Sequence, residues 1–243
     1  MSPAVNLGTA VLVLATLACS VSIPSIRGLT GSGNVVTLEQ DFADFDRVEI
    51  SHAFHATITQ GDSFAVVVRV DDNLEPLLQV EQVGDTLSIG LTDETGFGTL
   101  SATLEVDITL PSLAAVDASG ASQVVLVDIA SPGEIHLDGS GASRFNGDLE
   151  AHGVALTLSG AGSPSLRGGA QELRVVGSGA STADLEEFPV TNAEVILSGA
   201  GTTTVVVSGT LSVDASGASR VTYLGSPSLG DVNVSGGSSV EPG

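Results

Sequence analysis

Ser119-Gly120-Ala121-Ser122 is a motif that returns, exactly or with one residue replaced by glycine, six more times along the chain. Successive first serines are 21, 19, 19, 20, 18 and 19 residues apart. A unit of this length is too short to bury its own apolar face, so it must stack on its neighbours to form a solenoid. The later copies begin at Ser140, Ser159, Ser178, Ser198, Ser216 and Ser235.

Apolar residues precede each copy with the two-residue period of a β-strand. An aliphatic residue stands three positions before the first serine, and an apolar or small residue stands one position before it. A polar residue such as Asp117 or Thr157 separates them in most copies, and alternation of this kind indicates strands rather than helices. The two columns are Val116, Leu137, Leu156, Val175, Val195, Val213 and Val232, then Ala118, Gly139, Leu158, Gly177, Leu197, Ala215 and Val234.

A glycine follows the first serine in every copy, and an alanine follows that glycine in six of the seven. Glycine reaches backbone conformations that are closed to other residues, so we expect it at a bend between two short strands. We expect the small alanine to lie inside the tight corner. The predicted bend glycines are Gly120, Gly141, Gly160, Gly179, Gly199, Gly217 and Gly236.

About 19 residues divide into three short strands and three bends, which form one coil of a parallel β-helix. Coils stack about 4.8 Å apart, so seven coils would make a rod of roughly 30–35 Å. A propeller blade needs about 40 residues, and a meander of hairpins would show two-residue Asn-Gly or Asp-Gly turns. The sequence therefore predicts an all-β protein, a single-stranded parallel β-helix.

Residues 34–115 alternate in the same way but lack the motif, and we expect irregular coils or a cap there. With residues 116–243 they form one β-helix domain, 34–243. One helical turn is expected at residues 73–78, where Pro76 follows Glu75. Strands are expected at residues 48–50, 56–58, 64–70, 87–91 and 104–110.

Residues 1–20 form a predicted signal peptide, because the apolar run 7–19 is too short to span a bilayer. Two processing routes fit the end of this segment. In the first route, Cys19, which follows the small residue Ala18, is lipidated as in a bacterial lipoprotein. In the second route, an ordinary signal peptidase cuts the chain near Ala18 or Ser20. Residues 21–33 are a predicted linker. We therefore expect an exported protein of the cell envelope, the outer surface or the medium, with a membrane contact only through the N-terminal anchor.

The composition restricts the partners and the chemistry. The chain of 243 residues carries seven arginines, no lysine and a formal net charge of −22, which repels nucleic acids and anionic lipid head groups. Hydrophobic residues make up 42% and aromatic residues 3%, which suits a narrow interior of aliphatic side chains. The single cysteine excludes a disulfide framework and a multi-cysteine metal site.

No candidate cluster predicts a metal ion or a cofactor. His52 and His55 lie three residues apart, and in one strand their rings would face opposite sides. Asp71-Asp72-Asn73 lacks the glycine and the distal glutamate of a calcium loop. His136 and His152 are isolated among polar positions.

The serines and the aspartates of the repeat are candidate catalytic groups. Gly139-Ser140-Gly141 and Gly177-Ser178-Gly179 surround candidate nucleophiles, but a nucleophilic serine needs a base within reach, and this serine occurs in every copy. Asp117, Asp138 and Asp214 share one repeat position, where polysaccharide-cleaving β-helices carry carboxylates. Since Thr157 follows Asp138 on the next coil, we predict no catalytic residues.

An ordered set of segments resembles the putative auto-transporter adhesin head domain family, also called the GIN domain. The resemblance covers roughly residues 35–240 and implies an exported bacterial protein with a right-handed parallel β-helix and no established catalytic residues. His52 and His55 depart from the small or apolar residues of the family pattern. The segments that carry the resemblance are residues 45–50, 56–61, 71–74, 86–89 and 108–113, followed by the repeats.

The sequence as a whole predicts an exported β-solenoid that acts by binding, adhesion or assembly, on an unidentified protein or glycan ligand. Two alternatives stay open, a polysaccharide-active β-helix enzyme and an envelope scaffold or sensor partner. A groove with clustered carboxylates and Arg or Lys would favour the enzyme, and polar, shallow faces would favour a binding rod. At the C-terminal coil we expect weak protection by Glu241 and Pro242, and hence either fraying or end-to-end self-association.

Overall fold

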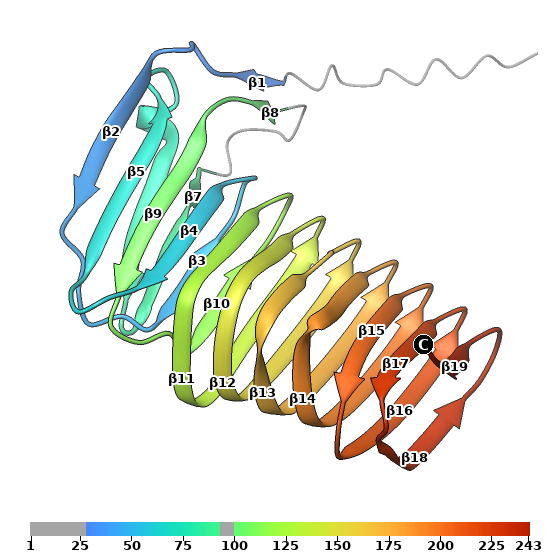
Figure 1. Ribbon diagram of the computed structural model, residues 1–243. Coiled ribbons are helices and arrows are strands. Elements are labelled where there is room, and N and C mark those ends of the chain that lie inside the picture. Colours follow the sequence, from blue (N-terminus) through green and yellow to red (C-terminus); the bar gives the residue numbers. More distant parts are fainter. Residues whose placement is uncertain (1–27, 93–99) are drawn as a thin grey trace, which may run out of the picture.

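The computed structural model describes residues 28–92 and 100–243, and nearly all of its regular elements are β-strands. Figure 1 shows coils that follow one another along a rod, from green to red, with the N-terminal strands at the opposite end. The N-terminal elements are β1 (Leu29–Thr30), β2 (Val35–Gln40), β3 (Arg47–Ile50), β4 (His55–Gln60), β5 (Ala65–Asp71), the short 3₁₀ helix η1 (Glu75–Leu77), β6 (Leu78–Val83), β7 (Thr86–Leu91), β8 (Leu100–Ser101) and β9 (Leu104–Leu110).

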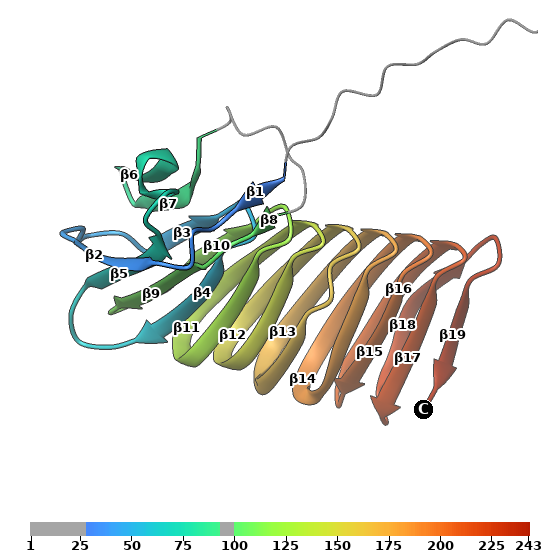
Figure 2. The same ribbon diagram turned by 90° about the horizontal axis from the view of Figure 1, so that it is seen from above.

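The repeats form a parallel β-solenoid, which confirms the predicted fold class. Several strands bend around a corner without interruption, so that one strand contributes to more than one side of the rod (Figure 2). These elements are β10 (Ala115–Ala118), β11 (Gln123–Gly141), β12 (Arg144–Gly160), β13 (Ser165–Gly179), β14 (Thr182–Gly199), β15 (Thr202–Val207), β16 (Thr210–Gly217), β17 (Arg220–Gly225), β18 (Ser228–Val234) and β19 (Ser239–Pro242).

Two long sheets run the length of the rod, and a short third side connects them. Face A holds the residues just before each Ser-Gly corner, in the order β6-β7-β3-β10-β11-β12-β13-β14-β16-β18. Face B holds the residues after the corner, in the order β2-β5-β9-β4-β11-β12-β13-β14-β15-β17-β19. On the third side, residues 129–131 pair with 149–151, which pair in turn with 168–170. A register shift separates this side from face B in the β11–β12 and β13–β14 pairs but not in the β12–β13 pair.

The first coil precedes the seven repeats and has no glycine at its corner. Ile50 pairs with Ala118, so Ser51-His52-Ala53-Phe54 occupies the place of Ser119 to Ser122. His52 has a φ of 59° and Ala53 a φ of 64°, the left-handed conformation that glycine adopts at the other corners. β3 and β4 therefore form a coil of the solenoid, although the sequence of its corner does not match the repeated motif.

Antiparallel strands end both faces on the N-terminal side. β6 pairs with β7 on face A, and β2 and β9 both pair with β5 on face B. The predicted helical turn at residues 73–78 is confirmed as η1, with Leu74 buried at its start. β6 begins at Leu78, a strand that the sequence pattern did not reveal.

The corners stack directly on one another, and their glycines share a left-handed backbone, with φ between 70° and 108° at the seven repeats. The N–H of Ala161 donates to the carbonyl oxygen of Gly141 at 2.7 Å, and the same bond recurs from coil to coil. At Gly160 a Cβ atom would lie 2.5 Å from that oxygen, so both conformation and space require glycine.

The alanine after the glycine lies outside the corner, so our expectation that it lies inside is wrong. Ala121 and Ala161 are exposed, whereas the fourth residue of the motif is buried, as serine or as glycine, in every copy except the last, where Ser238 is partly exposed. Buried Ser122 donates its hydroxyl to the carbonyl oxygen of Ser119 at 2.8 Å, and Ser219 bonds to Ser216 in the same way at 2.9 Å. In these two copies the hydroxyl bonds to the backbone of its own corner, which makes it suitable for the interior, whereas the buried hydroxyl of Ser143 has no hydrogen-bond partner among the described residues.

The side chains at two interior positions of the repeat, the residue just before the motif and the fourth residue of the motif, compensate each other in size. Each position forms an interior column of stacked side chains along the rod. The residue before the motif is leucine in the copies whose fourth residue is glycine, as in Leu158 with Gly162 and Leu197 with Gly201. A Cβ atom on Gly139 would lie 3.1 Å from Leu158 Cδ2, and one on Gly177 would lie 2.7 Å from Leu197 Cδ2. Each leucine thus fills the space that a glycine in the preceding coil leaves free, and Leu158 also fills the space beside Gly162 in its own coil, as close packing requires.

The last described coil leaves part of its interior column uncovered. Leu229, Val232 and Val234 are 53%, 38% and 46% exposed, whereas Val213, at the position of Val232 one coil earlier, is 2% exposed. β18 and β19 pair on one side only within residues 28–92 and 100–243. Fraying or self-association at this coil stays a prediction.

Candidate functional site

A groove lies on face A where the N-terminal strands meet the first coils. Its volume is about 430 Å³, and carboxylates, hydroxyls and one imidazole supply its polar lining. Strands β3, β6, β7, β10, β11 and β12 each contribute residues, so the groove crosses the junction between the antiparallel edge and the regular solenoid. The lining in the described part of the chain includes no Arg, Phe or Tyr.

Carboxylates line up across this groove because the strands are in register. Asp117 pairs with Asp138 on one side and with Glu49 on the other. Glu49 pairs with Ser88, which donates its hydroxyl to Glu49 Oε2 at 2.6 Å, and Ser88 in turn pairs with Glu81. Residues in one register column project from the same side of a sheet at about 4.8 Å intervals. We call Glu49, Asp117 and Asp138 the carboxylate line.

The carboxylate line produces a strongly negative potential. Partial burial in the groove raises the pKa of Asp117, and the charges of Asp138 and Glu49 raise it further. Arg47 and His136 act in the opposite direction but do not cancel the rise. An ionised Asp117 therefore lacks sufficient positive charge nearby, and a cation in the groove would supply it.

Four serine hydroxyls form a second column beside the carboxylate line, and the imidazole of His52 lies at the end of this column. Ser51, Ser119, Ser140 and Ser159 occupy the position two residues further along face A. His52 Nδ1 lies 2.7 Å from Ser51 Oγ and accepts the backbone N–H of Leu91 at 3.3 Å. The imidazole therefore fixes the end of β7 against the first corner.

The structure brings together two of the three aspartates that the repeat position singled out. Asp117 and Asp138 are neighbours, whereas two aliphatic side chains, Val176 and Ile196, separate Asp214 from Thr157 along the same column. Sequence reasoning considered only the coil after Asp138, and it missed Glu49. The pattern Val48-Glu49-Ile50 repeats Val116-Asp117-Ala118, and this likeness is the signal that could have found Glu49.

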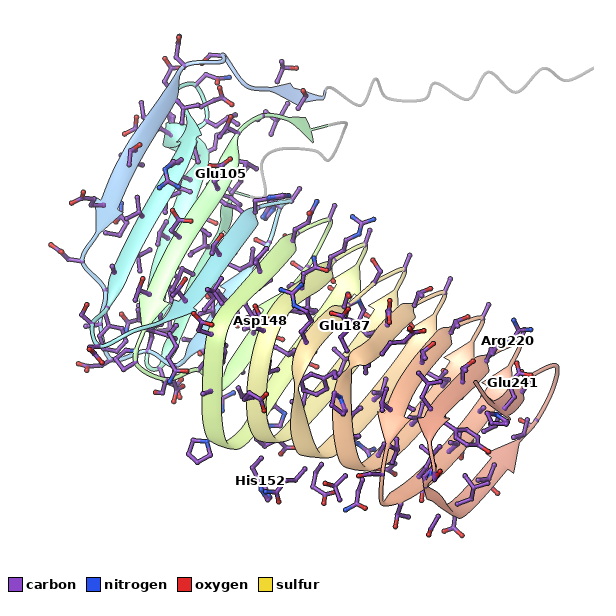
Figure 3. All side chains as sticks on the ribbon, viewed as in Figure 1. Glu105, Asp148, His152, Glu187, Arg220 and Glu241 are labelled. Carbon is purple, nitrogen blue, oxygen red and sulfur yellow. The ribbon has the colours of Figure 1, made fainter. Side chains whose placement is uncertain are left out.

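The histidines do not form a pair, but not for the predicted reason. His52 lies in a left-handed turn, while His55 begins β4 on face B, so the assumption that both lie in one strand is wrong. His136 Nε2 lies 3.7 Å from Glu134, and His152 projects from the surface (Figure 3). Within residues 28–92 and 100–243, no three His, Cys, Asp or Glu side chains are placed to hold a metal ion.

The remaining candidates have structural partners or lie outside the described residues. Ser178 donates its hydroxyl to the carbonyl oxygen of Leu158 at 3.4 Å, while Ser140 lines the groove. Asp71-Asp72-Asn73 holds the N-terminal segment, as described below. Cys19 and the predicted signal peptide fall outside the described residues. In the described part of the chain no helix is long and apolar enough to cross a membrane.

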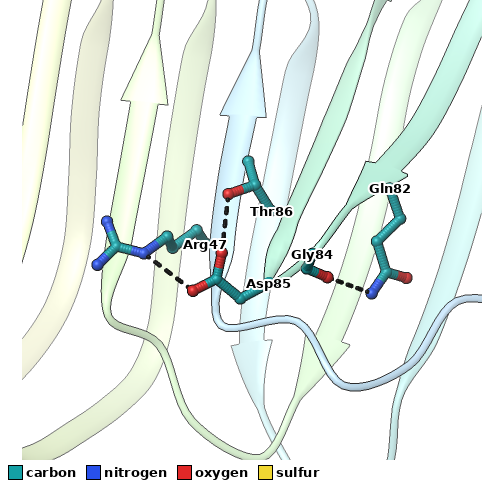
Figure 4. A network of polar contacts seen from close by, with 5 residues as sticks. All are labelled: Arg47, Gln82, Gly84, Asp85 and Thr86. Carbon is teal, nitrogen blue, oxygen red and sulfur yellow. Dashed lines mark hydrogen bonds and ion pairs between the residues drawn. The ribbon is translucent and has the colours of Figure 1, made fainter.

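Arginines mostly bridge neighbouring coils or strands. Arg167 bonds to Asp148 at 2.9 Å, and this hydrogen bond lowers the pKa of Asp148. Arg47 lies 3.5 Å from Asp85, which also bonds to Thr86 (Figure 4). The other arginine pairs in the described ranges are Arg69 with Asp107 and Glu105, Arg144 with Ser163, Arg174 with Glu194 and Arg220 with Glu241. These arginines thus pair with side chains on neighbouring strands or coils, and none of them lines the groove, whose carboxylates keep their negative charge.

Asp117→Asn should stabilise the protein at neutral pH. The folded pKa of Asp117 lies above its unfolded value, so the folded state binds the proton more tightly, and stability falls as pH rises through the raised pKa. Removing the ionisable group should raise the melting temperature at pH 7 by up to about 3 °C and flatten its dependence on pH above 4. Asp214→Asn, at the same repeat position outside the groove, is the control and should change neither. A lower melting temperature in Asp117→Asn than in the wild type would contradict this electrostatic account.

Comparisons with known proteins agree with the fold. Residues 44–227 match the family described as "Putative auto-transporter adhesin, head GIN domain". A putative adhesin from Bacteroides fragilis superimposes with a TM-score of 0.79 at 17% identity, covering 88% of this chain and 100% of its own. A putative adhesin from Parabacteroides merdae gives 0.66 at 18% identity, covering 88% and 98%. A structure described as a putative lipid binding protein, from Parabacteroides distasonis, gives 0.65 at 16% identity, covering 89% and 99%. No curated protein matches the sequence.

Proposed function

The chain belongs to the putative auto-transporter adhesin, head GIN domain family, and from this premise we propose that it is an exported, non-catalytic binding rod of the cell envelope or outer surface. Its ligand is a protein segment rich in Arg and Lys, held in the groove on face A. The observation that carries this proposal is the carboxylate line, three acidic side chains in register within one concave surface.

The chemistry of the groove favours a cationic partner over other ligand classes. Glu49, Asp117 and Asp138 repel anionic ligands, and no arginine among the described residues lines the groove to offset them. Sugars are commonly held by stacking on aromatic rings, and no Phe or Tyr lines the groove in the described residues. Ammonium and guanidinium groups would pair with the carboxylates and bond to the adjacent serine hydroxyls.

A fluorescent decalysine peptide tests the proposal. At low ionic strength the wild-type protein should bind it, and added salt should weaken the complex because it screens the charges. Asp117→Asn with Asp138→Asn should weaken binding by about 5- to 30-fold, the effect of losing two partly exposed charge pairs. Asp214→Asn with Asp231→Asn removes the same number of charges from β16 and β18 outside the groove, and this matched control should change the affinity less than about twofold. Equal losses in both variants would mean that only the net charge attracts the peptide, and the groove would have no specific role.

The carboxylate line also favours one alternative, a polysaccharide-active enzyme. A carboxyl group with a raised pKa beside an ionised one is the arrangement that glycosidases use as acid and base. The absence of arginine from the lining, in the part of the chain that the structure describes, speaks against a site that holds acidic sugars. Release of reducing ends from neutral or acidic polysaccharides by the wild type, and its loss in Asp138→Asn, would establish the enzyme instead.

Export depends on the N-terminal segment, and Cys19 provides the test. In a native-like bacterium the full chain should partition into the membrane fraction through a lipid on Cys19, and Cys19→Ser should release it. Ala18→Gly keeps a small residue before the cysteine and should leave the protein in membranes. Cytoplasmic protein with an intact N-terminus in all three forms would contradict export.

A further inference from the structure

The first described residues are fastened to one turn of the domain. β1 pairs in parallel with β8 over only two residues, too short a contact to hold the segment alone. Gly31 adds one bond to this pair, from its N–H to the carbonyl oxygen of Ser101 at 2.8 Å, whereas residues 32–34 bond to the side chains and backbone of Asp71, Asp72 and Asn73. We call residues 29–34 the N-terminal strap. The strap overlaps the predicted linker, residues 21–33.

Asp71 joins three parts of the chain. Its carboxylate is buried, with 2% of the residue exposed. One oxygen accepts the N–H of Gly33 at 2.7 Å, and the other accepts the N–H of Thr103, between β8 and β9, at 2.7 Å. A Cβ atom on Gly31 would lie 2.0 Å from this carboxylate, so only glycine lets the strap pass so closely. β5, the strap and the entry to β9 therefore meet at a single side chain.

Asp72 and Asn73 fix the exposed side of the strap. Asn73 accepts the N–H of Ser32 at 2.9 Å and donates its amide to the carbonyl oxygen of Thr30 at 3.0 Å. Asp72 accepts the hydroxyl of Ser32 and donates its backbone N–H to Asn34 at 2.8 Å. Leu29 adds an apolar contact with the core. The turn thus bonds to the strap at Thr30 and at residues 32–34.

We propose that the Asp71–Asn73 turn is a mechanical lock for the tether of this protein. The inference rests on the proposed function, in which an anchor N-terminal to residue 28 holds the rod while a partner occupies the groove. Tension between these two points enters the domain at the strap. The bond between Asp71 and the strap transfers this tension to β5, which is paired with β2 on one side and with β9 on the other. Without this bond, the tension would pull the strap away from the short β1–β8 pair.

Hydrogen exchange tests the lock in the full chain. The amides of Gly33 and Thr103 should be protected in the wild type and should exchange at least about tenfold faster in Asp71→Asn, because one bond to a carboxylate oxygen is worth about that factor. Amides in residues 150–200 should keep their protection, which shows that the solenoid stays folded. Asp62→Asn, in an exposed turn of the same end, is the control and should behave like the wild type. Wild-type amides at Gly33 and Thr103 that exchange freely would overturn the inference.

Force spectroscopy then separates a lock from a merely ordered segment. With handles at both termini, Asp71→Asn should release the strap at a lower force than the wild type, and Asp62→Asn should not. If Asp71→Asn does not fold, Asn73→Ala takes its place in the comparison, because this substitution removes two hydrogen bonds on the exposed side of the strap. Equal release forces in the wild type and the folded variant would overturn the lock. Neither readout involves decalysine, so failure here is distinct from failure of the groove as a binding site.

Discussion

Gly160→Val should lower the free energy of unfolding by about 3–5 kcal/mol, the sum of backbone strain and overpacking. Gly160 has a φ of 100°, which a β-branched residue adopts only at considerable cost. Its Cβ would also lie 2.5 Å from the carbonyl oxygen of Gly141, an atom fixed by the bond from Ala161. The strain therefore cannot relax without breaking the stack, and denaturant unfolding followed by circular dichroism should show the loss.

Ala161→Val is the matched control for this substitution. Ala161 is the next residue of the same corner, and it is exposed. A valine there meets solvent, so the free energy of unfolding should change by less than about 0.5 kcal/mol. If the two variants were equally destabilised, the alanine would lie inside the corner after all, and our description of the corner would fail.

Leu158→Ala should cost about 2–5 kcal/mol, the range for a leucine removed from a packed core. Leu158 is 2% exposed, and its Cδ2 occupies the space beside Gly139 and Gly162. Neither glycine has a side chain that could move into the vacated volume, so we expect a value in the upper part of that range. Thermal or denaturant unfolding measures the loss.

Val234→Ala is the control, because Val234 occupies the same repeat position in the last described coil. It is 46% exposed, so little contact is lost on truncation and the cost should stay below about 1 kcal/mol. A large loss at Val234 would show that this coil is covered in solution. A small loss at Leu158 would show that the interior columns do not compensate each other.

The repeat made the solenoid predictable, but not the direction of its side chains at the corner. A fixed period of about 19 residues with alternating apolar positions defines stacked coils whatever the corner geometry. Which of Ala121 and Ser122 points inward depends on the left-handed turn at Gly120, because a positive φ rotates the chain that follows. Small size suggested alanine, but Ser122 can satisfy its hydroxyl on its own backbone and therefore tolerates burial.

The groove was less predictable because long-range pairing creates it. Asp117 and Asp138 belong to the repeat, so their adjacency follows from the period. Glu49 joins them only because β3 pairs with β10, and its coil is hidden by His52 in place of the bend glycine. The antiparallel strand β6, which brings Glu81, begins inside a segment with helical-turn signals.

The most direct test of the central claim maps decalysine on the protein by backbone amide chemical shifts. If the groove on face A binds cationic segments, the largest shifts should cluster at residues 49–52, 117–119 and 138–140, saturate with the peptide, and vanish in Asp117→Asn with Asp138→Asn. Residues around Asp214, on the same face, should shift little. Shifts of similar size spread along both faces of the rod, or centred away from Asp117, would contradict the claim.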